Sequence, residues 1–351
     1  MPKLNPALLT RARQVDLIVY LHAHGHQPAY TRRNKALFHS PLREDRHPSF
    51  SVFYKDGAWK WIDYGTNEHG DGIDLVMQLR GLEFQAAVNE LLGTWQDTPI
   101  DPALENPRRS YSRREIRRLY QSYRAAMTPE YHFCLQHYFL QRDIAYPDGL
   151  GLVYLTLRVH GDGTRVPYVG IPVPSPQPHL MTGIECRALD DQTIDKQYAR
   201  RTLGDKTLWI VRRPTSSMLV TESILDCLAG NQLLQNRTSL CALNSVNNID
   251  QLVPCMQQLR PVTIYLALDN DPDRTSSQST NRKRSPPGPA AQQKAADALG
   301  RAGFRVVEVQ HHREAGVKDL HKLLRRDASP ITLEALERRG IIHEPTRAVS
   351  V

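Results

Sequence analysis

The 351-residue sequence lacks several features that would define its class directly. Its five cysteines are scattered and none forms a Cys-x-x-Cys pair, which predicts neither a zinc site nor a disulfide framework and fits a reducing cytoplasm. No run reaches about 18 apolar residues, and no apolar segment followed by a cleavage site opens the chain, so we expect no membrane span and no membrane partner. No Gly-x4-Gly-Lys-[Ser/Thr] motif occurs, so any helicase partner is expected to be a separate protein.

The sequence does have an excess of positive charge. Lys and Arg number 45 against 37 Asp and Glu, which gives a net charge of +8 and a pI near 9.3. Such a balance indicates a polyanionic partner, although it says nothing about the fold. The length is sufficient for two or three domains with buried cores.

Two short apolar runs, 218–221 and 262–268, end abruptly in acidic residues. Their length and β-branched content are typical of buried parallel strands. Glu222 follows the first run, and Asp269 and Asp271 follow the second. Ligands of open α/β sheets bind at the carboxyl ends of strands, where three carboxylates would repel one another unless a hard divalent cation lay between them. This pattern predicts a Mg²⁺ (or Mn²⁺) site, with helix-capping acids as the alternative.

The segment around these runs alternates between strand and helix patterns from 218 to 326. Such alternation predicts a doubly wound α/β sheet. The further strands are expected at 239–243 and 304–309, and the helices at 223–234, 249–259, about 289–302 and 318–326.

The order of these motifs resembles the Toprim domain of bacterial primases, topoisomerases and some nucleases. That family has a strand ending in Glu and a later strand ending in Asp-x-Asp, here Glu222 and Asp269-Asn-Asp271, although Ser223 replaces the usual Gly. Val317-Lys-Asp-Leu-His321 resembles its last acidic motif, with Asp319 matching and His321 in place of a frequent second Asp. The resemblance implies that Glu222, Asp269 and Asp271 are catalytic metal ligands and that Asp319 also contacts metal.

Upstream, the N-terminal segment has the pattern of a small α+β domain. We expect one amphipathic helix over 5–23 and a β-hairpin of 50–54 and 58–64 closed by Asp56-Gly57. Asp71 can cap a helix over 73–80, and another helix is expected at 83–92.

This block resembles the N-terminal zinc-binding domain of DnaG-type primases, through Pro48-Ser-Phe-Ser-Val52 and Gly70-Asp71. No zinc is expected, because the positions of the family's ligands hold no thiol and no imidazole. The aromatic side chains of this block have two possible roles. They can replace the metal by packing in the core, or they can stack on the bases of a single strand. The ligand positions are Ser40, Arg43, Asp63 and Thr66, and the aromatic residues are Trp59, Trp61 and Tyr64.

A basic helix follows a Pro-rich segment over 97–112. Ser112 and Glu115 have capping-box spacing, which predicts a helix to about 125, and Thr128 with Pro129 begins a second helix to Leu140. The first helix has a basic face that is either simply solvated or a nucleic-acid contact. Its arginines are Arg113, Arg114, Arg117 and Arg118.

The segment 151–213 has the alternation of a β-rich subdomain. Tyr138-Phe-Leu-Gln-Arg142-Asp-Ile144 resembles the Tyr-Leu-x-x-Arg-Gly-Ile that opens the primase core, and Gly183-Ile-Glu-Cys-Arg187 with Lys196 resembles its basic subdomain. The resemblance implies that Arg142, Arg187 and Lys196 bind nucleotide or template phosphates. The alternative for Arg187 and Lys196 is a pair of surface cations on a hairpin.

Taken in order, the motifs resemble those of a DnaG-type primase. We expect an α/β protein with a zinc-ribbon-like domain lacking its ligands (1–96), a basic linker and helix (97–127), a basic subdomain (128–214), a Toprim domain (215–326) and a tail (327–351). The resemblance implies synthesis of RNA primers on single-stranded DNA for a plasmid or other mobile element. A Toprim nuclease and an inactive nucleic-acid-binding accessory protein remain the alternatives.

Overall fold

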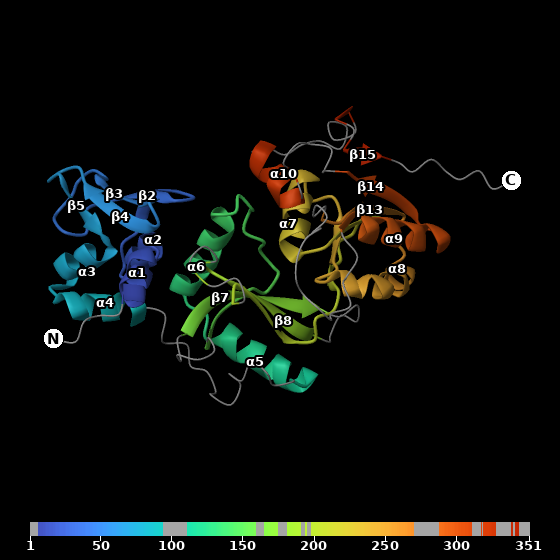
Figure 1. Cartoon of the computed structure of the whole chain (residues 1–351), viewed down its shortest axis with the longest axis horizontal. Coiled ribbons are helices and arrows are strands. Elements are labelled where there is room, and N and C mark those ends of the chain that lie inside the picture. The colour runs from blue at the N-terminus through green and yellow to red at the C-terminus, as the bar shows by residue number, and fades with distance from the viewer. Residues whose placement is uncertain are drawn as a thin grey trace.

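The computed structural model describes residues 6–93, 111–158, 165–174, 181–190, 198–269, 288–310, 319–327 and 341–343, with 194, 317 and 338–339. Across these residues the chain is a mixed α/β protein with three sheets, two of them antiparallel (Figure 1). None of the described helices is long and apolar enough to cross a membrane.

The first two helices differ from the single helix expected over 5–23. Helix α1 spans Pro6–Gln14 and α2 spans Leu17–Ala23, with a break at Asp16. Asp16 Oδ1 accepts hydrogen bonds from the backbone N–H groups of Ile18 and Val19 at 2.9 and 3.4 Å, and therefore caps a new helix instead of continuing the old one.

An antiparallel sheet in the order β1-β2-β3-β4-β5 forms the body of the N-terminal domain. The predicted hairpin is present, with Lys55 paired to Ala58 and positive φ at Asp56 and Gly57. Trp59 and Trp61 are buried in its core, whereas Tyr64 is 60% exposed. The strands are Pro28–Arg32, Lys35–Phe38, Phe50–Lys55, Ala58–Asp63 and Glu68–Asp71.

Helices α3 (Gly72–Arg80) and α4 (Phe84–Gly93) close this domain, as predicted. Asp71 and Asp74 form a reciprocal capping box at the start of α3. One buried cluster joins the helices to the sheet; it includes Leu17, Phe50, Trp61, Ile73 and Val88.

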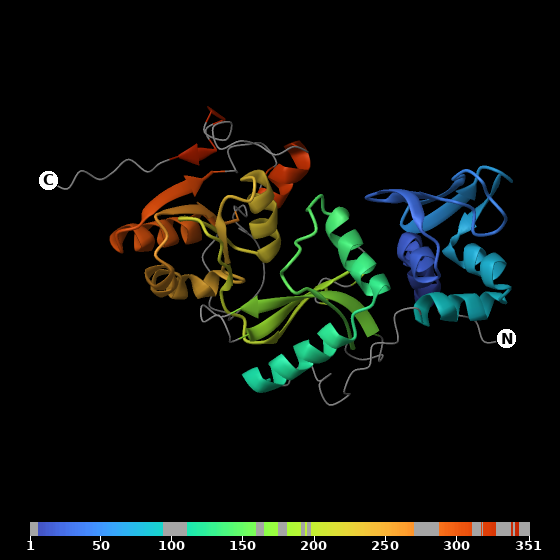
Figure 2. The same ribbon diagram turned by 180° about the vertical axis from the view of Figure 1, so that it is seen from behind.

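The middle of the chain is a four-stranded antiparallel sheet in sequence order, β6 (Val153–Arg158), β7 (Arg165–Pro174), β8 (Met181–Ala188) and β9 (Arg200–Gly204). Helices α5 (Arg113–Ala125) and α6 (Pro129–Leu140) begin at the predicted caps, Ser112 and Thr128. They cover opposite faces, because Ile116 and Leu119 pack in one cluster and Leu135 and Phe139 in another (Figure 2).

The last sheet has the order β10-β12-β11-β13-β14-β15. Its four central strands are parallel, and the edge strands β10 and β15 are antiparallel to their neighbours. The strands are Trp209–Val211, Ser217–Thr221, Ser239–Ala242, Thr263–Ala267, Arg305–Val309 and Ile342–His343, numbered β10, β11, β12, β13, β14 and β15.

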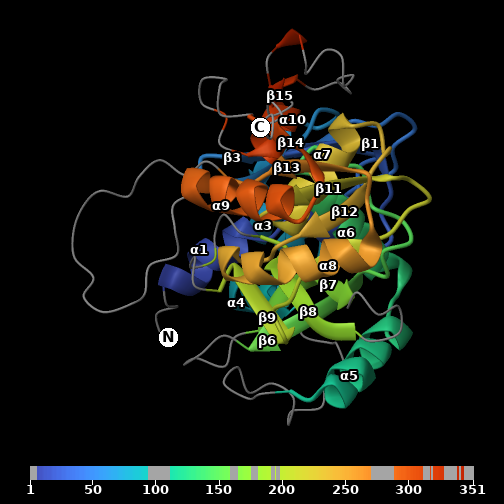
Figure 3. The ribbon, with the colours of Figure 1, turned by 90° about the vertical axis from the view of Figure 1, so that its right-hand side faces the viewer.

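Helices cover both faces of this sheet (Figure 3). Helices α7 (Ile224–Leu233) and α10 (Leu320–Asp327) pack in one cluster with Leu219 and Ala267. Helices α8 (Leu252–Leu259) and α9 (Gly288–Arg301) pack in the other with Met218 and Leu266, and a short 3-10 helix, η2 (Val246–Gln251), precedes α8. Alternate residues of the same strands therefore face opposite helix layers, as the strand and helix pattern predicts.

Candidate functional site

The acidic residues that follow the two predicted strands lie at one edge of the last sheet. Strands β11 and β13 are parallel neighbours, with Thr221 paired to Ala267. Glu222 and Asp269, both half-buried, therefore leave the carboxyl ends of adjacent strands. Asp271, the third predicted ligand, lies outside the described residues.

A second pair of carboxylates, Asp226 and Asp319, lies at the starts of α7 and α10. Both are buried, at 6% and 8% exposure. Burial, and then the charge of Asp319, raise the pKa of Asp226 from 3.8 to about 6, although Ser223 and the backbone N–H of His321 donate hydrogen bonds to its carboxylate. The carboxyl of Asp226 is therefore poorly compensated when ionised.

Sequence reasoning did not select Asp226. The signal was present, because Glu222 and Asp226 are four residues apart and Ser223 begins a helix between them. That spacing puts the second carboxylate one helical turn beyond the strand end. The four residues Glu222, Asp226, Asp269 and Asp319 are called the acidic edge below.

Three cations lie near the acidic edge: Arg187 of β8, Arg200 of β9 and Lys206 of the loop after β9. Lys206 interacts with the charge of Glu222, and partial burial followed by the charge of Arg200 lowers the pKa of this lysine. Arg187 interacts with the charge of Asp226, and its own pKa is lowered by burial and by Arg200. The middle sheet therefore contributes positive charge where the last sheet contributes negative charge.

Arg187 is held by a buried carboxylate, Glu185, which it shares with Arg200. The Arg187 Nε lies 3.3 Å from Glu185 Oε1, and Arg200 pairs with the same oxygen. Nε and Nη2 of Arg187 donate no hydrogen bond to any residue that the structure describes. A buried guanidinium with unmet donors beside a carboxylate pair is suited to an anionic ligand.

The loop after β12 joins the two regions. The Asn244 backbone N–H donates to the Glu222 carbonyl at 2.9 Å, and the Asn244 carbonyl accepts from Arg200 Nη2 at 3.1 Å. Its side-chain Nδ2 donates to the Thr207 carbonyl at 2.9 Å. Asn244 has a φ of 58°, a left-handed conformation that asparagine tolerates well. These bonds fix the backbone of Glu222 relative to Arg200 and to the loop that contains Thr207.

A cavity of about 720 Å³ lies between the N-terminal domain and the core. Leu225 and His321, neighbours of Asp226 and Asp319, form part of its wall. Five arginines line it against two aspartates, Asp16 and Asp190, together with several aromatic side chains. The arginines are Arg11, Arg33, Arg142, Arg165 and Arg325, and the aromatic residues are Tyr54, Trp59, Tyr138 and Tyr198.

The N-terminal domain contacts α6 beside this cavity. His137 Nε2 and Gln141 Nε2 lie 2.8 and 3.1 Å from Asp16 Oδ2, and His22 stacks on Phe133 with ring centroids 3.6 Å apart. Asp16, at the break between α1 and α2, thus both caps α2 and contacts α6 of the core.

The remaining predicted cations lie in three different settings. Arg142 is buried, stacks on Tyr138 and donates from Nη1 to the Tyr138 carbonyl at 3.1 Å, so part of its hydrogen bonding is used within its own helix. Lys196 lies outside the described residues. The α5 arginines Arg113, Arg114, Arg117 and Arg118 are exposed, and α5 covers the face of the middle sheet opposite α6.

The donor set of the acidic edge fits a hard divalent cation, because it consists of carboxylate oxygens with a raised pKa at one of them. Within the described part of the chain no three His, Cys, Asp or Glu side chains are arranged to hold a metal ion. Glu222 and Asp269 as metal ligands, together with Asp271, remain a prediction.

No protein-family model matches the chain, and no curated protein matches it. Solved structures do. The zinc-binding and RNA polymerase domains of the Aquifex aeolicus primase align over 96% of this chain and 85% of theirs, at 15% identity and a TM-score of 0.38. The primase fragment of the bacteriophage T7 primase-helicase covers 83% of this chain and 95% of its own, at 13% identity and a TM-score of 0.35.

A DnaG catalytic core aligns over 65% of this chain and 78% of its own length, at 14% identity and a TM-score of 0.43. The resemblance to bacterial and phage primases predicted from the motifs is thus confirmed as a resemblance. Because these TM-scores lie below 0.5, the similarity does not decide the function. The function has to be argued from the residues of the site.

Proposed function

We propose that this chain is a primase-like nucleotidyltransferase that joins ribonucleotides on single-stranded DNA. In this proposal Glu222, Asp269 and Asp271 hold Mg²⁺ or Mn²⁺, and Asp226 and Asp319 form a second acidic pair beside them. The bound ion would neutralise nucleotide phosphates and the charge that develops during phosphoryl transfer. We retain the Toprim assignment of the last sheet, the plasmid or mobile-element context and a separate helicase as parts of the proposal.

One observation carries the proposal: carboxylates of the acidic edge interact with cations from the middle sheet and from the loop after it. Glu222 and Asp269 follow adjacent parallel strands, Arg187 comes from the middle sheet and Lys206 from the loop after it. The phosphates of a nucleotide can bind both to cationic side chains and to a metal ion held by carboxylates. The cations and the carboxylates of this arrangement would therefore each have a function. A nuclease needs the carboxylates but has less need for a second, nucleotide-binding cation set.

The cavity supports a path for the template. Its net positive lining would neutralise phosphates, and the partly exposed Tyr54 and Tyr198 offer ring faces on which bases can stack. Leu225 and His321 in its wall lie close in sequence to Asp226 and Asp319. A strand bound there would contact both the N-terminal domain and the core.

Incubation of the protein with labelled ribonucleotides and single-stranded DNA, with Mg²⁺, with Mn²⁺ or with chelator, tests the proposal. We expect metal-dependent products several nucleotides long. Cleavage of the DNA or of added RNA without synthesis would establish the nuclease alternative. Binding without either reaction, in every metal condition, would establish the inactive accessory protein. Asp250→Asn, at an exposed carboxylate that pairs with Lys294, is the control that should retain synthesis.

A further inference from the structure

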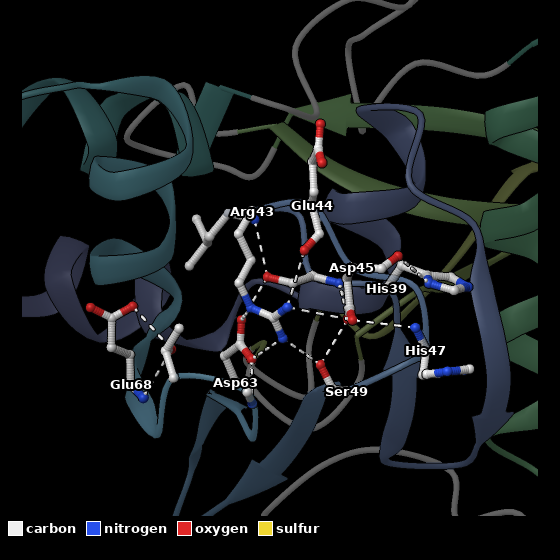
Figure 4. A network of polar contacts seen from close by, with 12 residues as sticks. His39, Arg43, Glu44, Asp45, His47, Ser49, Asp63 and Glu68 are labelled. Carbon is white, nitrogen blue, oxygen red and sulfur yellow. Dashed lines mark hydrogen bonds and ion pairs between the residues drawn. The ribbon is translucent and has the colours of Figure 1, made fainter.

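The two loops of the N-terminal domain that correspond to zinc knuckles are joined by an ion pair in this chain (Figure 4). Arg43 Nη2 and Nε donate to Asp63 Oδ1 and Oδ2 at 2.9 and 3.1 Å. Ser40 Oγ donates to the same Asp63 Oδ2 at 2.6 Å. Three of the four positions that correspond to the family's zinc ligands therefore bind one another.

Asp63 is fully engaged in these bonds. It is 1% exposed, and its Oδ1 also accepts the Gly65 backbone N–H at 2.8 Å, so its two oxygens accept four hydrogen bonds. Burial alone would raise the pKa of Asp63, but the hydrogen bonds from Arg43, Ser40 and Gly65 outweigh it, and the pKa is lowered. The carboxylate is ionised and compensated.

A second carboxylate, Asp45, extends the network. Its Oδ2 accepts the Ser40 backbone N–H at 2.9 Å and the Ser49 hydroxyl at 2.7 Å, and Arg43 Nη1 lies 3.5 Å from its Oδ1. These bonds, led by that from Ser49, lower the pKa of Asp45 to about 2. The residues Ser40, Arg43, Asp45, Ser49 and Asp63 are called the knuckle network below.

The knuckle network does not fit zinc. It contains no thiolate and no imidazole, and both of its carboxylates, Asp45 and Asp63, are paired with the Arg43 guanidinium. The fourth position, Thr66, bonds instead to Glu68 at 3.3 Å. A methyl group at Gly65 would lie 2.0 Å from Arg43 Nη2, so the turn after Asp63 leaves the space that the guanidinium occupies.

We propose that the Arg43 guanidinium has replaced the structural metal ion of this domain. It is a permanent cation that joins the loop before β3 to the turn after β4 through bidentate hydrogen bonds. The two tryptophans pack in the core of the sheet beside it and do not fill the metal position. The N-terminal domain thus folds without metal, and its stability rests on Arg43 and Asp63.

Hydrogen exchange of the full chain, read from peptides covering residues 36–76, tests this proposal without depending on any activity. We expect Arg43→Met to speed exchange about tenfold or more, because it leaves a buried carboxylate unpaired. Arg43→Lys should fall between that variant and the unmodified protein, since lysine keeps the charge but not the fork. Gly65→Ala should resemble Arg43→Met by displacing the guanidinium. Arg46→Met, at an exposed arginine in the same loop, is the matched control and should change nothing.

The double variant Arg43→Met with Asp63→Leu should recover much of the lost protection, because replacing both partners leaves no buried charge. Chelator treatment of the unmodified protein should leave exchange unchanged, and elemental analysis should find no stoichiometric zinc. About one zinc per chain, faster exchange in chelator, or equal behaviour of Arg43→Met and Arg46→Met would each overturn the proposal. These two measurements on unmodified protein decide the matter even if a variant fails to fold.

Discussion

The buried carboxylates of the N-terminal domain and those of the acidic edge have surroundings that differ in kind. In the N-terminal domain, Asp63 accepts four hydrogen bonds and pairs with Arg43, and its pKa is lowered. At the acidic edge, Asp226 lies beside another carboxylate, Asp319, and its pKa is raised to about 6. The first carboxylate stabilises the fold by being charged, whereas the second costs stability whenever it is charged.

The difference separates structural acids from candidate functional acids. A compensated carboxylate has no remaining demand for a ligand, while a poorly compensated one such as Asp226 gains free energy when a cation binds. Arg187 and Lys206 do not remove this demand, because Arg187 is shared with Glu185 and the pKa of Lys206 is itself lowered. The comparison therefore favours the acidic edge as the place of chemistry.

The largest expected effect is on synthesis. Glu222→Gln and Asp269→Asn should each reduce ribonucleotide incorporation about a hundredfold or more, since loss of even indirect metal contacts costs up to that factor. Both variants should remain folded, and the double variant should be little worse than either single one if one metal is shared. Incorporation assays with Asp250→Asn as control check this. Full activity in Asp269→Asn would remove the acidic edge from the mechanism.

The next effect is on stability, and the same type of substitution should have opposite signs in the two regions. Asp226→Asn should stabilise the last sheet by about 1–3 kcal/mol at pH 7.5, because a folded-state pKa of about 6 against 3.8 unfolded penalises the ionised form. The penalty disappears below about pH 4, and so should the gain. Asp63→Asn should destabilise the N-terminal domain under the same conditions.

Hydrogen exchange over 217–233 and over 50–63 measures the two regions separately in one sample. Slower exchange of the first segment in Asp226→Asn, together with reduced synthesis, is the expected result. Faster exchange of that segment would mean that partners compensate the charge of Asp226, and that Asp226 is a structural acid like Asp63.

Much of this comparison was accessible from the sequence, because strand ends and helix caps are local features. The acids after 218–221 and 262–268 lie at one sheet edge because two apolar runs of strand length form parallel neighbours. The caps at Asp71, Ser112 and Thr128 are where their spacing predicts. Strands β1, β2 and β5 were not predicted. The residues of β1 and β5 are largely polar or exposed, so that pairing within the sheet makes them strands, and β2 has only four residues, too few to show a pattern although Ala36 and Phe38 are buried.

What the sequence did not contain is the pairing of charges across elements. The interaction of Arg187 with Asp226 joins strand β8 to helix α7, and the contact of Asp16 with His137 joins residues 121 positions apart. The knuckle network was equally hidden: the absence of zinc ligands was readable, but the ion pair between Arg43 and Asp63 required the fold of both loops. The cavity likewise exists only between domains.

A smaller effect, on DNA binding, is expected from the exposed arginines of α5. They differ from Arg43, which pairs with a buried carboxylate. Replacing the four exposed α5 arginines by glutamine should weaken binding to single-stranded DNA and reduce its salt dependence by up to roughly 0.7 log units per lost phosphate contact. Turnover at saturating DNA should hold, because α5 covers the sheet face opposite α6. The replaced residues are Arg113, Arg114, Arg117 and Arg118.

Titrations at several salt concentrations measure that slope. Arg260→Gln with Arg301→Gln, both exposed on the last domain, is the control and should leave it unaltered. An unchanged slope in the α5 variant would assign its arginines to a solvated helix face.

The smallest effect is the pH response of the unmodified protein, which should differ between the two regions. For Asp45 and Asp63 the folded pKa is lowered, so their stabilising contribution is present above the unfolded value of 3.8 and is lost as pH falls toward the folded value, about 2 for Asp45. For Asp226 the shift is upward, so its penalty is present above about pH 6 and fades toward pH 4. Lowering the pH from 7 to 4.5 should therefore raise the protection of 217–233, measured relative to the intrinsic exchange rate at each pH, and leave the protection of 50–63 unchanged, whereas further acidification should loosen 50–63. Loosening of 50–63 between pH 7 and 5 would instead point to a histidine, the group that usually titrates there, and would contradict a network built on two carboxylates and a guanidinium.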